Sequence, residues 1–71
     1  MDAEKRGPFG SWLHGVREKK GEVSGESAKT IGVHRVTYLN WERGENKPAI
    51  GSLAGIAKWA GVEVGDVLGL V

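Results

Sequence analysis

Cysteine is absent from this chain, and its absence sets the first limits on what the chain can be. Without thiols there is no disulfide and no thiolate metal site, a pattern that fits a reducing cytoplasm. No apolar run approaches the length of a membrane span, and the N-terminus lacks a signal-peptide core. The 71 residues therefore predict one small domain with a limited core.

An excess of charge of one sign is also absent. Ten basic residues stand against nine acidic ones, which gives a formal net charge of +1. Many DNA-binding domains are far more basic, so total charge is weak evidence for a nucleic-acid partner. Any electrostatic footprint must come from the distribution of the charges.

Residue groups that carry catalysis or bind metals are missing as well. We find no paired carboxylates, no nucleophile with a neighbouring base, and no glycine loop suited to cradle a phosphate. His14 and His34 lie far apart and lack partners at ligand spacing, so no metal site is expected. The sequence predicts neither an enzyme nor a cofactor.

The N-terminal part of the chain predicts a tail followed by a helix. Residues 1–7 are charged, mixed in sign and end in glycine, which predicts a disordered tail. Pro8 suits the first position of a helix. Apolar residues then recur at helical spacing in Phe9, Trp12, Leu13 and Val16. This pattern predicts an amphipathic helix that ends near Lys20, with Gly21 as its stop.

Two short helices are predicted next, separated by a glycine turn. The first covers Ser24 to Ile31, where Ser24 can serve as the cap. Gly32 is suited to the turn, because a positive φ costs little only for glycine. The second covers residues 35–43, with His34 at its cap and Gly44 at its end.

The C-terminal third predicts a fourth helix and a short fifth one. The inward stripe of the fourth helix is expected to contain Ile50, Leu53, Ile56, Ala57 and Ala60. The fifth is suggested by Val64, Val67 and Leu68. The prediction is an all-α domain of four or five helices over residues 8–71, after a tail at residues 1–7.

The predicted third helix has two chemically different sides. At 100° per residue, one side carries Thr37, Tyr38 and Trp41. The opposite side carries Arg35, Val36, Leu39, Asn40 and Arg43. Such a helix can bury one face and present guanidinium, amide and apolar groups to the base edges of a DNA major groove.

The spacing of these features resembles the helix-turn-helix family of the Cro and phage-repressor type (XRE-like). The likeness runs without a gap from about Phe9 to Leu68. The matching positions are Arg17, Gly21, Ala28, Gly32-Val33, Glu42-Arg43-Gly44 and Pro48. The chain departs from the family at Glu22 and Ser27, where apolar residues are usual, and at Ser24, where Gln is usual.

The resemblance implies a lambda-repressor-like fold and a set of DNA-contacting residues. Base contacts are implied at Arg35, Val36, Thr37 and Asn40. Arg can bind guanine and Asn adenine through two hydrogen bonds, and Val can meet a thymine methyl group. Contacts to the DNA backbone are implied at Ser24, His34, Arg43, Asn46 and Lys47. The alternative interpretation is that these residues have no role in DNA binding and form only a solvated helix face and an ordinary polar turn.

Two further expectations concern architecture. Arg17 and Glu42 match a pair that joins the first and third helices of relatives, so we assign them to structure and not to catalysis. The apolar tail is a candidate dimer contact, although ordinary packing of the fifth helix remains open; it comprises Val64, Val67, Leu68, Leu70 and Val71.

The function implied by the resemblance is sequence-specific binding of double-stranded DNA by a transcriptional regulator, such as a repressor. A homodimer on a two-fold operator is expected, in the cytoplasm of a bacterium or encoded by a phage and associated with the nucleoid. No small-molecule ligand is expected.

An alternative is a protein-interaction module on the same fold, such as an antitoxin, adaptor or coactivator. It is favoured by the near-neutral charge, by Val36 and Leu39 on the reading face, and by the altered second helix.

Overall fold

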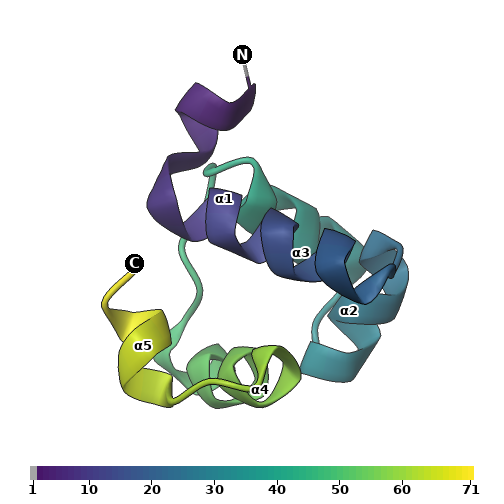
Figure 1. Cartoon of the computed structure of the whole chain (residues 1–71), viewed down its shortest axis with the longest axis vertical. Coiled ribbons are helices and arrows are strands. Elements are labelled where there is room, and N and C mark those ends of the chain that lie inside the picture. Colours follow the sequence, from purple (N-terminus) through teal and green to yellow (C-terminus); the bar gives the residue numbers. More distant parts are fainter. Residues whose placement is uncertain (1) are drawn as a thin grey trace.

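The computed structural model describes residues 2–71, with side chains from residue 7 onwards. This part of the chain contains five helices and no strand, which confirms the predicted all-α class. They are α1 (Asp2–Lys20), α2 (Ser24–Ile31), α3 (Arg35–Glu42), α4 (Ile50–Ala60) and α5 (Val64–Leu68). Helix α1 packs against α3, α2 against both α3 and α4, and α4 against α5 (Figure 1). None of these helices is long and apolar enough to cross a membrane.

Helix α1 is two helical pieces joined at Gly7. The φ of 68° and ψ of −178° at Gly7 interrupt the helix immediately before Pro8. The backbone of residues 2–6 forms a helical turn on the far side of this break, which the sequence pattern does not predict. Met1 lies outside the described residues. The division into a tail at residues 1–7 and a domain at residues 8–71 stays a prediction.

The turn between α2 and α3 is set by glycine, as expected. Gly32 has a φ of 99°, and the backbone N–H groups of Gly32 and Val33 both donate to the carbonyl of Ala28, at 2.8 and 2.9 Å. The left-handed residue reverses the chain within one turn, which places α3 across α2.

The predicted caps of α2 and α3 are partly wrong. The N-cap residue of α2 is Val23 rather than Ser24, and the carboxylate of Glu26 accepts the Val23 N–H at 3.0 Å. Glu26 thus satisfies one of the free N–H groups at this helix start, which Ser24 was expected to do. His34 occupies the N-cap position of α3, but its side chain makes no capping hydrogen bond.

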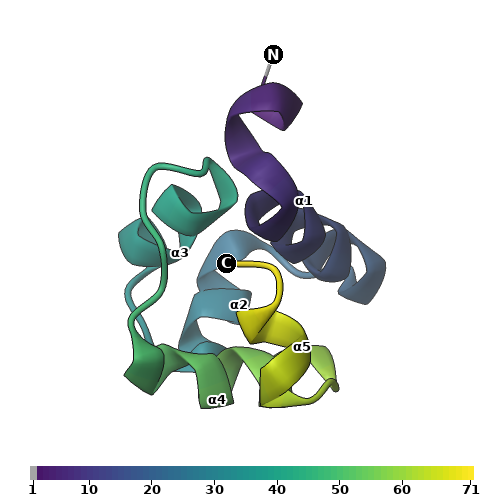
Figure 2. The same cartoon turned by 90° about the vertical axis from the view of Figure 1, so that its left-hand side faces the viewer.

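All five helices contribute residues to the core. Its buried apolar residues are Phe9, Leu13, Ala28, Ile31, Tyr38, Trp41, Leu53, Ile56, Ala57, Trp59 and Val67. The ring of Tyr38 meets Trp41 and Trp59 edge-on, at interplanar angles of 61° and 78°. After α5 the chain turns back, and Leu70 and Val71 pack against the core (Figure 2).

The predicted inward stripe of α4 is wrong at its first residue. Ile50 is 86% exposed, whereas Leu53, Ile56 and Ala57 are buried and Ala60 is half-buried. Ile50 is the first residue of α4, where the chain leaves the loop, and it does not reach the core cluster. Helical spacing alone does not reveal where along a helix the covering elements end.

Gly55 marks the closest approach of α4 to α2. A Cβ atom at this position would lie 2.6 Å from the carbonyl oxygen of Ile31. Because that atom is backbone at the end of a helix, it cannot move aside as a flexible side chain would. The two helices therefore pack at this distance only if residue 55 is glycine.

We expect Gly55→Ala to destabilise the domain by about 1–3 kcal/mol, because α4 must move away from α2. Gly51→Ala is the matched control in the same helix, since a Cβ there has nothing within 4 Å. It should leave stability unchanged or raise it by up to about 1 kcal/mol. Urea unfolding followed by tryptophan fluorescence measures both, and equal stabilities would disprove the proposed close packing.

Candidate nucleic-acid interface

The outer face of α3 is formed by the residues that the sequence predicts. Arg35, Val36 and Arg43 are exposed, with Val36 at 64%, while Leu39 and Asn40 are half-buried. On the inner side, Tyr38 and Trp41 are buried. Thr37 lies between the two faces and is half-buried. The helix therefore presents a guanidinium, a branched apolar group and an amide outward, while its aromatic residues fix it to the core.

The predicted backbone-contacting residues lie at the two ends of α3 and at the start of α2. Asn46 and Lys47 are exposed in the loop that leads from α3 to α4, close after Arg43. His34 is exposed at the start of α3, and Ser24 is half-buried at the start of α2. Contacts between these residues and DNA, like the base contacts, stay predictions.

A buried ion pair fixes α3 against α1. Arg17 Nε donates to Glu42 Oε2 at 2.7 Å, and Arg17 Nη2 lies 3.3 Å from Oε1. The Glu42 side chain is only 6% exposed and that of Arg17 19%. Arg17 Nη1 also donates to the carbonyl of Glu22 at 3.1 Å, so one guanidinium joins α1, α3 and the segment before α2.

His14 belongs to the same polar cluster, although sequence reasoning gave it no role. Its Nδ1 lies 3.1 Å from Glu42 Oε1, and its Nε2 lies 3.2 Å from Glu18 Oε2. His14 and Arg17 are three residues apart on α1 and therefore share a face of that helix. This spacing is the feature of the sequence from which the role of His14 could have been predicted. Among the described residues, no group of three or more metal-ligating side chains is suitably placed for a metal ion.

The pKa of Glu42 reflects both its burial and its partners. Burial alone would raise it, but hydrogen bonding to Arg17 and His14 holds it below its usual value. Glu42 is therefore ionised at neutral pH inside the joint between α1 and α3.

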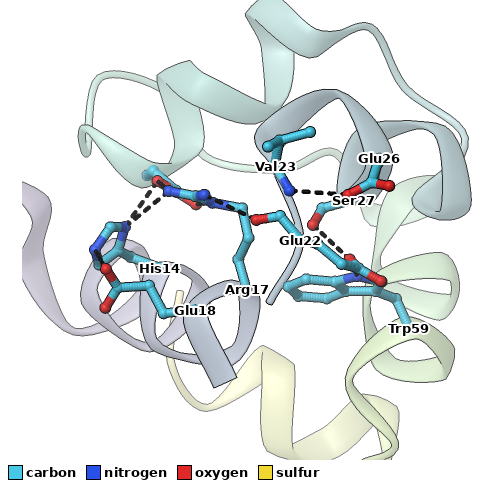
Figure 3. Close-up of polar contacts among 9 residues, drawn as sticks. His14, Arg17, Glu18, Glu22, Val23, Glu26, Ser27 and Trp59 are labelled. Carbon is cyan, nitrogen blue, oxygen red and sulfur yellow. Dashed lines mark hydrogen bonds and ion pairs between the residues drawn. The ribbon is translucent and has the colours of Figure 1, made fainter. Parts of the chain in front are cut away.

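A second carboxylate, Glu22, explains two departures from the family pattern. Its Oε1 accepts the hydroxyl of the fully buried Ser27 at 2.7 Å and the indole N–H of Trp59 at 3.0 Å. These two donors hold the pKa of Glu22 below its usual value. Two positions that are usually apolar thus form a polar bridge between α2 and α4 (Figure 3).

The hydroxyl of Tyr38 is the one buried side-chain polar atom without a hydrogen-bond partner in the described part of the chain. Burial raises the pKa of Tyr38 far above its usual value, so the group stays neutral. An unsatisfied buried hydroxyl costs free energy, which the aromatic packing of the ring must offset.

We expect Arg17→Ala and Glu42→Ala each to lower the free energy of unfolding by about 2–4 kcal/mol, because each leaves the other charge with little solvent. An exposed pair would contribute only about 0–1 kcal/mol. The double variant should cost clearly less than the sum of the singles. Additive losses in urea unfolding would mean that the two charges are not coupled.

The lowered pKa of Glu42 predicts a dependence of stability on pH. The pKa of Glu42 in the folded state lies below its value in the unfolded chain, which is about 4.3. Ionised Glu42 therefore adds to the free energy of unfolding at pH values above the unfolded-state pKa. This contribution is lost as the pH falls through the folded-state pKa. Parent protein should therefore exceed Glu42→Gln in stability at pH 7, and the difference should shrink below pH ~4. Urea unfolding of both proteins across this range is the measurement. A difference that stays constant with pH would contradict the assignment.

Comparison with known proteins places this architecture in a class. No protein-family model and no curated protein sequence matches the chain. Two crystal structures of the clp gene regulator ClgR from Corynebacterium glutamicum are similar to it, each at 30% sequence identity over 89% of this chain. The TM-scores are 0.71 and 0.75, and 82% and 67% of the respective ClgR chains are covered.

Two features define the class as helix-turn-helix proteins, together with these similarities. They are the glycine turn between α2 and α3 and the attachment of the inner face of α3 to α1. The chain belongs to the family of helix-turn-helix gene regulators to which these ClgR structures belong.

Proposed function

We propose that the chain is a sequence-specific regulator of transcription, of the Cro and phage-repressor type, that binds double-stranded DNA with α3 in the major groove. The observation that carries this proposal is the exposed outer face of an α3 whose inner face is fixed by the Arg17–Glu42 pair. A rigid helix with outward guanidinium and amide groups is suited to hydrogen bonding with base edges. The similar ClgR structures are those of a gene regulator, which supports the same conclusion.

Each residue predicted to contact DNA has a distinct proposed role. Arg35 binds a guanine, Asn40 an adenine, and Val36 the methyl group of a thymine. Thr37, at the side of α3, adds a short polar contact. Contacts to phosphates come from Ser24, His34, Arg43, Asn46 and Lys47.

The distribution of charge supports this proposal better than the total does. Glu42 and Glu22 each accept hydrogen bonds from side chains within the domain, with Glu42 paired to a guanidinium. Arg35, Arg43 and Lys47, in contrast, are exposed, and no ion pair engages them within the described residues. The face around α3 therefore retains cations that can meet phosphates, although the formal net charge is only +1.

We further propose that the protein binds a two-fold operator as a homodimer, in the bacterial cytoplasm and associated with the nucleoid. Val67 is buried, and Leu70 and Val71 pack against the core. Val64 and Leu68 remain 44% and 58% exposed, and they lie four residues apart on α5. These two residues are the part of the apolar tail that is available to a second copy.

A second candidate is a protein-interaction module on the same fold. The exposure of Val36 next to the half-buried Leu39 favours it, because apolar groups on this face also suit a protein partner. Selection of bound sequences from a random DNA pool, followed by titration at several salt concentrations, separates the two. Sequence preference with steep salt dependence supports the DNA-binding regulator, and the absence of any selected sequence supports the interaction module.

Arg35→Ala and Asn40→Ala should each weaken binding to the selected site by about 1–3 kcal/mol and relax the preference at one base pair, because each removes a two-bond contact to a base. The measurement is the Kd for the selected site and for sites changed at single base pairs. If both variants bind every site as the parent does, the outer face of α3 is not the reading surface.

Lys47→Ala should instead weaken binding evenly across sequences and reduce the salt slope by about one charge, because phosphate contacts carry no sequence information. Lys58→Ala is the matched control, since Lys58 is also exposed but lies in a cleft with Lys20 and Trp59. Its salt slope should equal that of the parent. An unchanged slope for Lys47→Ala would remove this residue from the interface.

A further inference from the structure

Gly25 occupies a position where glycine has no conformational reason to be. It is the second residue of α2, its φ is not positive, and glycine favours a helix less than alanine does. No backbone approaches it closely, because the one atom within 4 Å of a Cβ built on Gly25 is Arg35 Cδ, at 3.6 Å. What the missing side chain leaves room for is therefore the stem of Arg35.

Arg35 is the first residue of α3, and its side chain extends back over the first turn of α2. Its guanidinium forms no ion pair or side-chain hydrogen bond within the described residues. Glu26, the acid next to Gly25 in the sequence, accepts a hydrogen bond from the Val23 N–H. The neighbour that the structure gives the Arg35 stem is thus position 25, where an added Cβ would lie 3.6 Å from Arg35 Cδ.

Restricting such a side chain before binding matters because the long arginine side chain has many rotamers in the free state. Part of that rotamer freedom is lost on binding unless the free protein already restricts the stem. A Cβ atom at position 25 would make only ordinary contact with the stem. A branched side chain adds atoms beyond Cβ on the side where the stem lies, so we expect it to compete with the stem for that space.

We propose that Gly25 is a positioning residue for base recognition: it provides a seat on α2 for the stem of Arg35 and so directs the guanidinium to one base. This inference rests on the proposed function of Arg35 in reading DNA. It assigns specificity to a residue of α2 that itself contacts no base.

The test compares five proteins on the DNA site selected by the parent and on sites changed at single base pairs. They are the parent, Gly25→Leu, Gly51→Leu, Arg35→Ala and the double variant Gly25→Leu/Arg35→Ala. Gly51 is the matched control because it is the second residue of α4 and its Cβ would meet open space.

We expect Gly25→Leu to lose about tenfold or more of the discrimination at the base pair that Arg35→Ala relaxes, and to keep discrimination at the other positions. Gly51→Leu should discriminate as the parent does. The double variant should discriminate no worse than Arg35→Ala, because the displaced stem is already absent. Thermal unfolding of Gly25→Leu should not be below that of the parent, so the loss is not one of folding.

Three results would overturn the inference. The first is unchanged discrimination in Gly25→Leu. The second is an even loss of affinity at all sites that persists in the Arg35→Ala background, since residue 25 would then meet DNA directly. The third is that Arg35→Ala has no effect on discrimination, which would show that Arg35 does not contact a base. A parent without any sequence preference would instead overturn the proposed function, and the inference with it.

A measurement on the free protein tests the seat even if Gly25→Leu does not fold. Nuclear Overhauser contacts between the α protons of Gly25 and the δ protons of Arg35 are expected in the parent, because one α proton of Gly25 points to the position that a Cβ would take, 3.6 Å from Arg35 Cδ. They should persist in Gly51→Leu. Their absence from the parent would show that the stem is not seated on α2.

Discussion

Glu42 is a nearly completely buried carboxylate, and the orientation of α3 depends on how its charge is compensated. A lone ionised carboxylate in this place would cost several kcal/mol, roughly the whole stability of a small domain. Arg17 supplies the compensating charge from α1 and also reaches the carbonyl of Glu22, while His14 lies within hydrogen-bonding distance of the same carboxylate. Because these bonds are directional, they fix the angle between α1 and α3, which aromatic packing alone leaves less well defined.

The second polar bridge continues this arrangement to α4. Glu22 accepts bonds from Ser27 of α2 and Trp59 of α4, so α4 is attached to the same segment to which Arg17 donates. Apolar residues at positions 22 and 27 would supply packing without direction. Here, in contrast, the helix-turn-helix unit is connected by hydrogen bonds to a helix on either side.

Helix periodicity and glycine punctuation were sufficient to predict most of the fold. Helix α2 has the predicted bounds, and α3 ends one residue before the predicted position. The errors share a physical cause: they depend on what lies opposite a residue in space. Ile50 continues the apolar stripe of α4 in sequence, yet no element covers it. The close approach at Gly55 is equally invisible from the sequence, because it depends on the path of the α2 backbone.

The same limit applies to the candidate site. The outward residues of α3 followed from a 100° rotation per residue, and the resemblance supplied the positions of Arg17 and Glu42. The partners of Glu22 did not follow, because Ser27 and Trp59 approach it from different helices. In the sequence, Glu22 and Ser27 are only departures from a pattern. In the structure they form one hydrogen-bonded unit with Trp59.

Because the Arg17–Glu42 pair is largely buried, dissolved salt screens the exposed cations of this protein much more strongly than it screens this pair. Counterions reach exposed cations such as Lys47 freely, but they are largely excluded from a carboxylate that is only 6% exposed. Added salt therefore weakens the phosphate contacts proposed for these cations while leaving the joint between α1 and α3 nearly unscreened. Ionic strength thus acts on the exposed cations without loosening the attachment of α3 to α1.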